Sequence, residues 1–280
     1  IDAQRRGHAL VMSATAVPGS RSVALLRLRG GGVRADQDAV VEEVAIAFSY
    51  NGVGHAVMMA TPTELEDYAL GFSLHEGIVA TADELRFIEV VPREGGLVLE
   101  LAIPQVRFDT LAQHARRTLG SSACGLCGSE ALQQALRPLP QVVPAAFDAR
   151  SIAEALCRFP SLQSLNARTG GAHAAAWCDA VGVRVMREDV GRHNAVDKLV
   201  GALVRAGIDA RNGYVIVSSR ASYELVHKAA TSGVGTLVAL SAPTSAAIDG
   251  AKRCGMRLIG FARDGSMNVY TSESITECER

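Results

Sequence analysis

From residue 152 to its end, the sequence alternates between short strand-like runs and longer helix-like runs. Strand patterns cover residues 173–178, 183–188, 214–219, 236–240 and 257–262, and helix patterns cover residues 194–205, 223–230 and 245–254. Repeated alternation of this kind is typical of a layered α/β domain. The sequence therefore predicts an α/β domain over residues 148–280, with a sheet that is largely parallel at least in its last half. Ligands of such domains bind at the carboxyl ends of the strands.

The beginning of the chain has a different pattern, built from hairpins. Two extended runs within residues 40–61 are separated by Asn51-Gly52, a pair in which both residues tolerate positive φ. Residues 63–66, with the sequence Thr-Glu-Leu-Glu, have the spacing of a capping box. This spacing predicts a helix that begins there and ends at Gly77.

A second hairpin is predicted where residues 86–91 and 97–103 flank a glycine-containing turn. Together these elements predict a smaller N-terminal α+β domain. The expected organisation is a flexible tail over residues 1–22, the smaller domain over 23–107, a connecting region over 108–147 and the α/β domain over 148–280.

Charge and hydropathy exclude several classes of protein. The 28 Lys and Arg residues against 29 Asp and Glu residues give a net charge of −1, so no global basic field attracts nucleic acid. No apolar run approaches the roughly 18 residues of a membrane helix. The opening residues lack the continuous apolar segment of a secretory signal. We expect a cytoplasmic protein without nucleic-acid or membrane partners.

Cys124 and Cys127 form a Cys-x-x-Cys pair beside Gly125 and Gly128. Structural zinc needs four ligands, and the other four cysteines are isolated in the sequence. A thioredoxin-like redox pair sits at a strand-to-helix junction, whereas this pair falls in an apparent loop. Sulfur transfer is a third interpretation, because glycines suit a mobile loop that carries a persulfide between two sites. A loop pair without chemistry is the fourth, and the spacing alone leaves all of these open.

Polar residues gather after two neighbouring strand-like runs. Residues 188–198 place six ionisable side chains around a strand end and the first turn of a helix, and residues 218–228 form a comparable set. A solvated helix start explains some of these charges. Because strand ends meet at one edge of an α/β sheet, we predict one pocket for an anionic, nucleotide-like ligand. The candidate binding residues are His193, Asn194, Lys198, Arg220 and Lys228.

A further candidate segment follows the last strand of the alternating pattern. It comprises Phe261, Ala262, Arg263, Asp264, Gly265 and Ser266. Asp264-Gly265 is typical of a hairpin turn, and this reading needs no ligand. In the functional interpretation, Arg263 offers a planar donor fork and Asp264 accepts from the N1 and N2 donors of guanine.

At these residues the chain resembles the formate dehydrogenase accessory sulfurtransferase family, FdhD. The matching motifs are CGLCG at 124–128, TGGAHAA at 169–175, EDVGRHNAVDK at 188–198, SSRASYELVHK at 218–228 and FARDGSMNVYT at 261–271. They occur in the expected order across most of the chain. The first twenty residues lie outside the resemblance.

The resemblance implies a cytoplasmic sulfur carrier. It would take sulfur from a cysteine desulfurase and deliver it to the molybdenum cofactor, as bis-molybdopterin guanine dinucleotide, for formate dehydrogenase. By position, Cys124 matches the persulfide-bearing cysteine and Cys127 the second thiol, and residues 261–266 match the cofactor-binding segment. The family implies a cytidine-deaminase-like α/β domain and a homodimer, with no tightly bound metal of its own. The zinc signature of the deaminases themselves is missing from the sequence.

The alternative is a non-catalytic chaperone that binds the molybdenum cofactor or a guanine nucleotide, with cysteines that only anchor a loop. A persulfide mass adduct after incubation with a desulfurase and cysteine distinguishes the two.

Overall fold

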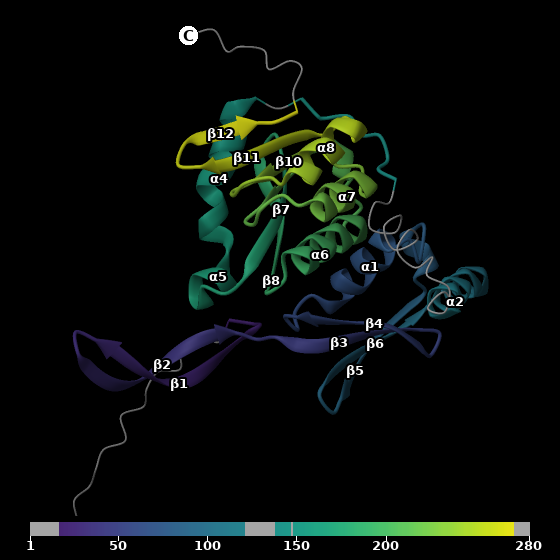
Figure 1. Ribbon diagram of the computed structural model, residues 1–280, viewed down its shortest axis with the longest axis horizontal. Coiled ribbons are helices and arrows are strands. Elements are labelled where there is room, and N and C mark those ends of the chain that lie inside the picture. Colours follow the sequence, from purple (N-terminus) through teal and green to yellow (C-terminus); the bar gives the residue numbers. More distant parts are fainter. Residues whose placement is uncertain (1–16, 121–137, 147, 272–280) are drawn as a thin grey trace, which may run out of the picture.

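The computed structural model describes residues 17–120, 138–146 and 148–271, which form a mixed α/β fold (Figure 1). The strands are β1 (Ser20–Arg29), β2 (Gly32–Val41), β3 (Val44–Tyr50), β4 (Val53–Ala60), β5 (Phe87–Arg93), β6 (Gly96–Ala102), β7 (His173–Asp179), β8 (Gly182–Asp189), β9 (Tyr214–Val217), β10 (Thr236–Ala239), β11 (Arg257–Arg263) and β12 (Ser266–Val269). The helices are α1 (Leu65–His75), α2 (Gln105–Gly120), α4 (Ala149–Leu162), α5 (Ser164–Thr169), α6 (Arg192–Arg205), α7 (Tyr223–Thr231) and α8 (Ser245–Cys254). The predicted α/β class is confirmed. Within the described part of the chain, no helix has the length and apolar character needed to cross a membrane.

The C-terminal strands form a six-stranded sheet in the order β12-β11-β10-β9-β7-β8. Strands β9, β10 and β11 run parallel, but β12, β7 and β8 pair antiparallel with their neighbours. The expected parallel pairing in the last half of the domain is confirmed for β9, β10 and β11, and it does not extend to β7, β8 and β12. Two-residue turns join β7 to β8 and β11 to β12. Such short connections impose antiparallel pairing, because a parallel crossover needs a dozen or more residues.

Helices cover both faces of this sheet (Figure 1). Helices α6, α7 and α8 pack on one face, where Leu199 and Leu225 are fully buried. Helix α4 packs on the opposite face, where Phe159 and Ile216 are fully buried. The sheet is thus the middle of three layers. Ser222 and Thr244 cap α7 and α8 by accepting hydrogen bonds from the backbone N–H groups of Leu225 and Ala247.

The four-stranded sheet, in the order β4-β3-β6-β5, packs one face on α1. The ring of Phe48 stacks on Phe72 at 4.0 Å between centroids and meets the edge of Tyr68 at 5.2 Å. Asn51 and Gly52 both have positive φ, of 50° and 80°. The predicted hairpin at this turn is confirmed, because β3 and β4 pair antiparallel across it.

Helix α1 confirms the predicted helix but not its predicted cap. Glu64 occupies the N-cap with a left-handed φ of 46° and no side-chain hydrogen bond to the helix. The capping-box prediction is wrong because the Thr63 hydroxyl does not cap the helix and instead accepts from Lys198 of α6 over 3.4 Å. Gly77 follows the helix with a φ of 68°, as predicted for the residue that ends it.

Helices α1 and α6 cross at two glycines and join the two sheets. A Cβ atom at Gly71 would overlap the backbone carbonyl of Asp197, and a Cβ atom at Gly201 would overlap the carbonyl of Asp67. Each helix therefore contains an Asp-x-x-x-Gly sequence, and the backbone of the other helix packs directly against its glycine. This reciprocal contact brings the helix backbones together without intervening side chains.

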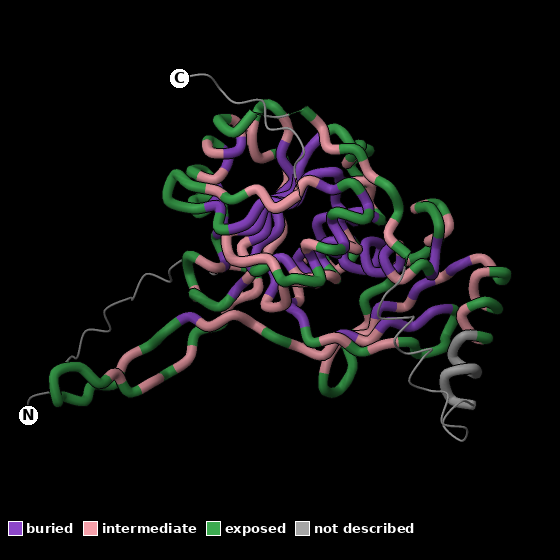
Figure 2. The backbone as a smooth tube through the Cα atoms, turned by 45° about the horizontal axis from the view of Figure 1, so that its top comes forward, coloured by how far each residue is buried: buried purple, intermediate pink, exposed green. Residues whose placement is uncertain are grey.

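Strands β1 and β2 form a two-stranded ribbon, here called the arm, that projects from the body of the molecule (Figures 1 and 2). All ten residues of each strand pair with the other strand. Near the base, Gly19 lies beside Leu165 of α5, and Gly171 lies beside Val41. The sequence analysis does not anticipate this ribbon, whose first strand begins at Ser20, inside the segment expected as a tail.

Candidate functional site

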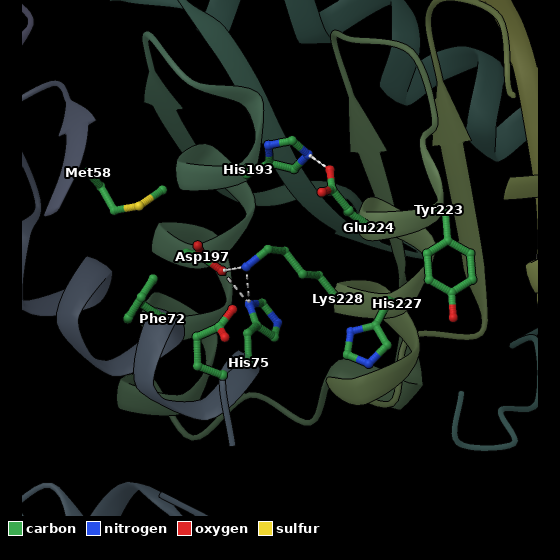
Figure 3. A pocket seen from close by; sticks show the side chains of 10 residues that line it. Met58, Phe72, His75, His193, Asp197, Tyr223, Glu224, His227 and Lys228 are labelled. Carbon is green, nitrogen blue, oxygen red and sulfur yellow. Dashed lines mark hydrogen bonds and ion pairs between the residues drawn. The ribbon is translucent and has the colours of Figure 1, made fainter. Parts of the chain in front are cut away.

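A pocket of about 270 Å³ opens between the two sheets, where α1 meets α6 and α7 (Figure 3). Its lining residues are Met58, Phe72, His75, Glu76, His193, Asp197, Tyr223, Glu224, His227 and Lys228. The first four come from β4, α1 and the residue after α1, and the other six from α6 and α7. The pocket therefore forms only where two units of the chain pack together. The N-terminal unit is the four-stranded sheet with α1, and the C-terminal unit is the six-stranded sheet with its helices.

Asp197 is the buried centre of the pocket wall. One of its carboxylate oxygens, Oδ1, contacts both Nδ1 of His75 and Nζ of Lys228. The side chains of Asp197 and His75 are 2% and 1% exposed. Burial opposes ionisation of Asp197, but Lys228 and His75 outweigh it and hold the carboxyl pKa below its ordinary value. Asp197 and Lys228 thus form an ion pair at neutral pH.

His75 is held in the neutral form at the same place. Burial and the ammonium of Lys228 lower its pKa, against the attraction of Asp197. Its Nε2 lies 2.9 Å from the hydroxyl of Ser232, which follows α7. The imidazole of α1 therefore connects two residues of the other unit.

His193 and Glu224 line the pocket from the first turns of α6 and α7 (Figure 3). Nε2 of His193 lies 2.7 Å from Oε2 of Glu224. The contact is an ion pair only when His193 is protonated, and it lacks the alignment of a hydrogen bond to any described residue. Burial lowers the pKa of His193, and Glu224 acts in the opposite direction. The imidazole nitrogen is available to a ligand that displaces Glu224, whose side chain is 65% exposed.

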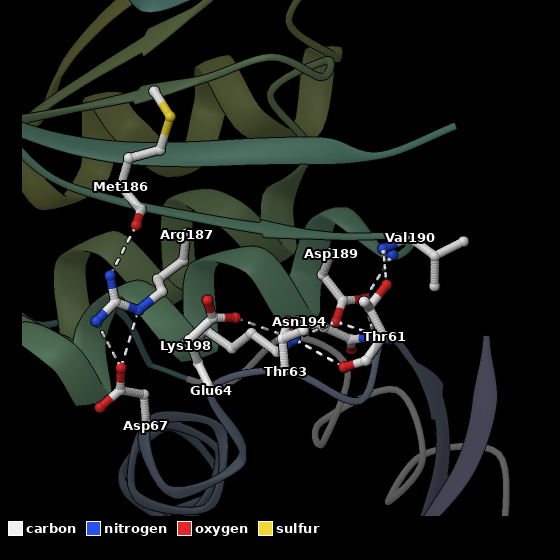
Figure 4. A network of polar contacts seen from close by, with 11 residues as sticks. Thr61, Thr63, Glu64, Asp67, Met186, Arg187, Asp189, Val190, Asn194 and Lys198 are labelled. Carbon is white, nitrogen blue, oxygen red and sulfur yellow. Dashed lines mark hydrogen bonds and ion pairs between the residues drawn. The ribbon is translucent and has the colours of Figure 1, made fainter. Parts of the chain in front are cut away.

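Beneath the pocket, Asp189 holds a second network that reaches from β8 to the other unit (Figure 4). Its Oδ2 accepts from the backbone N–H of Thr61 at 3.0 Å and lies 2.7 Å from Nζ of Lys198. Its Oδ1 accepts from the backbone N–H of Gly191 and from the side-chain amide of Asn194. The side chains of Asp189 and Lys198 are both 0% exposed. Every acceptor position of this carboxylate is therefore used within the protein.

Asp67 makes a third contact between the units. Arg187 of β8 donates to its Oδ2 through Nε and Nη2, at 2.8 and 2.7 Å (Figure 4). Arg205, at the end of α6, donates to its other oxygen at 2.9 Å. Asp67 thus binds two guanidinium groups beside the helix crossing, and Glu66 supplies a second carboxylate to Arg205.

The structure separates the residues predicted to line one pocket. His193 and Lys228 lie in the pocket wall. Asn194 and Lys198 belong to the buried network below, where Tyr68 also donates to the side-chain oxygen of Asn194 at 2.8 Å. Arg220 is exposed after β9 and does not line the pocket. Cys124 and Cys127 lie outside the described residues.

Residues 261–266 form the predicted turn between β11 and β12. Asp264 and Gly265 have φ values of 54° and 75°, and β11 pairs antiparallel with β12. Phe261 also has a positive φ, of 50°, at a point where the register of the two strands shifts. Its backbone N–H donates to the carbonyl of Ser241, and its side chain is 38% exposed. A bulky residue in the left-handed region is strained, and such strain is concentrated at functional sites.

The sequence analysis misses the pocket residues from the N-terminal part of the chain. These residues are Met58, Phe72, His75 and Glu76. They lie in a predicted hairpin and a predicted helix to which the sequence analysis assigns no ligand-binding role. The available signal was His75. It follows Gly71 by four residues, so its imidazole lies on the same face of the predicted helix. Among the described residues, no cluster of three His, Cys, Asp or Glu side chains is arranged to hold a metal ion.

The described cysteines differ in accessibility, which predicts their reactivity. Cys157 is exposed, whereas Cys178 and Cys254 are buried. Burial raises the pKa of the Cys178 thiol to about 12 and raises that of Cys254 as well. Iodoacetamide at mildly alkaline pH should therefore alkylate Cys157 in the folded protein and spare Cys178 and Cys254. Peptide mass mapping measures this, with the urea-unfolded chain as the fully labelled control; labelling of Cys178 in the folded protein would contradict the described core.

Comparison with known proteins gives consistent relatives. The model of the FdhD/NarQ family matches residues 41–276. The sulfur carrier protein FdhD of Bordetella petrii is 47% identical over 252 residues, which cover 89% of this chain and 91% of the relative. The protein of the same name from Xanthomonas euvesicatoria pv. vesicatoria is 50% identical over 257 residues, 91% of each chain.

The fold also has a solved counterpart. The crystal structure of a putative formate dehydrogenase accessory protein from Desulfotalea psychrophila superposes with a TM-score of 0.72 at 23% sequence identity. The match covers 91% of this chain and 98% of that one. At this identity the likeness establishes the fold.

Proposed function

The chain belongs to the FdhD/NarQ family, and on that premise we propose that it is a sulfur carrier for the maturation of formate dehydrogenase. The observation that carries the proposal is the match to relatives named sulfur carrier protein FdhD over about nine-tenths of their length. The proposal includes a cytoplasmic location and a homodimer, as the motif resemblance implies.

In the proposed cycle, Cys124 is the residue that bears sulfur. Its thiolate attacks the outer sulfur of a desulfurase persulfide, so that the desulfurase thiolate leaves and Cys124 becomes the persulfide. Attack of the Cys127 thiolate on the inner sulfur would expel the outer sulfur as hydrosulfide for the acceptor and leave a Cys124–Cys127 disulfide, which a small-molecule thiol reductant then reopens. The thiolate is the reactive form of cysteine, so transfer should require a thiol pKa near or below neutrality.

The proposed acceptor is the molybdenum cofactor as bis-molybdopterin guanine dinucleotide. Guanine and pterin rings share an amino-pyrimidinone edge whose N–H groups donate to carboxylates, and Glu76 and Glu224 supply carboxylates at the pocket. Among the pocket residues, His193 offers phosphate oxygens a ring nitrogen without a hydrogen bond to any described residue, and Lys228 offers an ammonium that also pairs with Asp197. Asn194 and Lys198 act as positioning residues, because the buried network occupies their polar groups.

The segment 261–266 supports the same acceptor. The exposed ring of Phe261 offers an apolar face to a planar heterocycle, and Arg263 and Asp264 are exposed at the turn that follows. Arg220 lies exposed after β9, at the same carboxyl edge of the parallel strands. An anionic substrate at this edge would meet Arg220 and Arg263 without breaking an existing buried contact.

Replacing Cys124 with alanine should abolish sulfur transfer while the fold is kept. Intact-mass spectrometry after incubation with a cysteine desulfurase and cysteine should show a persulfide adduct on the wild-type chain and none at this position in the variant. Cys157→Ala, which removes an exposed cysteine from α4, is the control and should retain the adduct. Formate dehydrogenase activity at the normal level with Cys124→Ala would refute the carrier role. Absence of any adduct on the wild type, combined with intact nucleotide binding, would favour the chaperone alternative.

Asp264→Asn should weaken binding of GDP about tenfold or more, because the variant loses a charged acceptor for the guanine N–H donors. Asn tolerates the left-handed φ of 54° at this position, so the turn is expected to persist. Isothermal calorimetry with GDP and ADP measures the effect and its base specificity. Asp249→Asn on the exposed side of α8 removes the same charge and should leave the affinity unchanged. Equal GDP affinity in both variants would assign residues 264 and 265 to a turn alone.

A further inference from the structure

One carboxylate oxygen of Asp197 has two partners at once. Its Oδ1 contacts Nζ of Lys228 from α7 and Nδ1 of His75 from α1 (Figure 3). Nζ of Lys228 also lies 3.5 Å from that same imidazole nitrogen. The lysine and the histidine are therefore alternative cations for one oxygen, and the geometry that either one needs is already in place.

Lys228 is the member of this cluster that a ligand can reach. Its side chain is 12% exposed and lines the pocket, whereas the side chains of Asp197 and His75 are almost completely buried. An ammonium on a flexible four-carbon stem can turn toward an anion in the pocket. Asp197 stays in the wall, and a buried carboxylate that loses its cation is strongly destabilising. Lys228 is thus free to bind a ligand only if a second cation replaces it.

The charge of the pocket also opposes an anion. Its described lining carries three carboxylates and one ammonium, those of Glu76, Asp197, Glu224 and Lys228. The lining residues that can gain a positive charge near neutral pH are His75, His193 and His227. With these histidines neutral, the lining holds two more negative charges than positive ones. An anionic group therefore binds here most favourably when a proton enters with it.

The hydrogen bonds of His75 suit both of its charge states. Nδ1 faces a carboxylate, so the proton of the neutral ring lies on Nδ1. Nε2 then accepts from the hydroxyl of Ser232 at 2.9 Å. The same hydroxyl lies 2.8 Å from the backbone carbonyl of Lys228 and can donate there instead. When Nε2 gains a proton, it donates to the Ser232 oxygen and the hydroxyl proton turns to the carbonyl, so no group loses its partner.

We propose that His75 is a positioning residue for the anion site, and that it takes up a proton when Lys228 leaves Asp197 for an anionic ligand. The proton comes from solution and binds Nε2 of the imidazole. The imidazolium then neutralises Asp197, while the ammonium pairs with the ligand. This inference rests on the proposed function for the identity of that ligand, a nucleotide phosphate.

The groups around His75 set the pH range of this exchange. They are Asp197, Lys228 and Glu76, with Tyr50 of β3 and His193 of α6 interacting with Asp197. Burial and Lys228 hold the pKa of His75 below its ordinary value of 6.5 in the free protein. After Lys228 has turned away, the carboxylate of Asp197 raises that pKa. Between the two values, binding takes up one proton, and the affinity for the anion falls as the pH rises.

Lys228→Met mimics the departure of the lysine and tests the exchange without a ligand. NMR of the ring nitrogens at neutral pH should show His75 neutral in the wild type and protonated in Lys228→Met. His75→Asn assigns the signal by its loss. A ring that stays neutral in Lys228→Met would overturn the proposal and leave the sulfur carrier function standing.

Calorimetry with GDP measures the proton uptake directly. At neutral pH, in buffers of different ionisation enthalpy, the wild type should take up about one proton more than His75→Asn. The Asn amide can donate to Asp197 from the place of Nδ1 but cannot gain a charge. Just above pH 6.5, the wild-type affinity should fall by up to about tenfold for each pH unit, and that of His75→Asn by no more than about twofold.

His55→Asn is the matched control, because His55 is an exposed histidine of β4 that does not line the pocket. It should keep the proton uptake and the pH dependence of the wild type. Equal uptake by the wild type and His75→Asn would overturn the proposal and assign the proton to His193 or His227. Absence of GDP binding at every pH would overturn both this inference and the proposed acceptor, while the persulfide adduct would still report on sulfur transfer.

Discussion

Adding a single methyl group at the helix crossing should destabilise the whole protein. Gly71→Ala and Gly201→Ala are each expected to lower the free energy of unfolding by about 3 kcal/mol or more, at the upper end of overpacking effects. In each case the new Cβ atom would overlap a backbone carbonyl of the other helix, which has no rotamer by which to move away. The gain in helix propensity from glycine to alanine is at most about 1 kcal/mol and does not offset this overlap.

Urea unfolding measures the effect through the fluorescence of Trp177, the one tryptophan of the sequence, which is 4% exposed in the core. Gly54→Ala is the matched control, because no atom lies within 4 Å of a Cβ there and the residue has no positive φ. Its unfolding free energy should stay within about 0.5 kcal/mol of the wild type. If Gly71→Ala and Gly54→Ala unfold at the same urea concentration, the helices do not meet as described.

Removing the charge of Lys198 should have an effect of similar size. Lys198→Met leaves Asp189 buried without its cation, and breaking one partner of a buried pair costs about 3–5 kcal/mol. The ammonium also donates to the carbonyl of Thr61 at 2.9 Å, so the substitution removes a contact between the two units as well. The remaining donors to Asp189 are neutral amides, which do not replace the lost charge.

The same denaturation experiment tests this, with Lys252→Met as the control on the exposed surface of α8. The control should change stability by less than about 0.5 kcal/mol, since exposed charges contribute little. A cost for Lys198→Met as small as that of the control would show that the Asp189 network is dispensable for folding. It would also return Lys198 to the set of residues free to bind a ligand.

Local chemistry accounts for the elements that the sequence predicts well. The turns at Asn51-Gly52 and Asp264-Gly265 need positive φ at both residues, and these residue pairs reach it at low cost. From Tyr214 onward, each predicted strand or helix has a clear hydrophobic period and the usual length of such an element. The positions of these elements are therefore predicted to within about two residues. The antiparallel pairing of β7 with β8 was not predicted, although the two-residue turn between them carried the information, whereas Asp264-Gly265 was predicted as a hairpin turn.

The pocket is harder to predict because its residues come from distant parts of the chain. Asp197 meets His75 across 122 positions of sequence, and no local pattern encodes that contact. The dense charges of residues 188–198 were interpreted as ligand-binding, and the structure uses Asp189 and Lys198 to join the two units instead. Ligand binding and contact between the two units both require ionisable groups near a strand end. The burial of those groups distinguishes the two roles. The arm was not predicted, although Gly30-Gly31 lies between two alternating runs, which is typical of a hairpin.

The crossing of α1 and α6 also limits how this chain can be divided. Each helix presents a bare glycine and a buried aspartate to the other, so either half made separately would expose backbone and charge that water must then solvate. No side-chain change on the opposite helix can make room for a Cβ atom at either glycine, because the overlapping atoms belong to the backbone. The two halves therefore cannot be shuffled between proteins as independent modules, and gene fusions or truncations should be tolerated only outside the segment from α1 to α6.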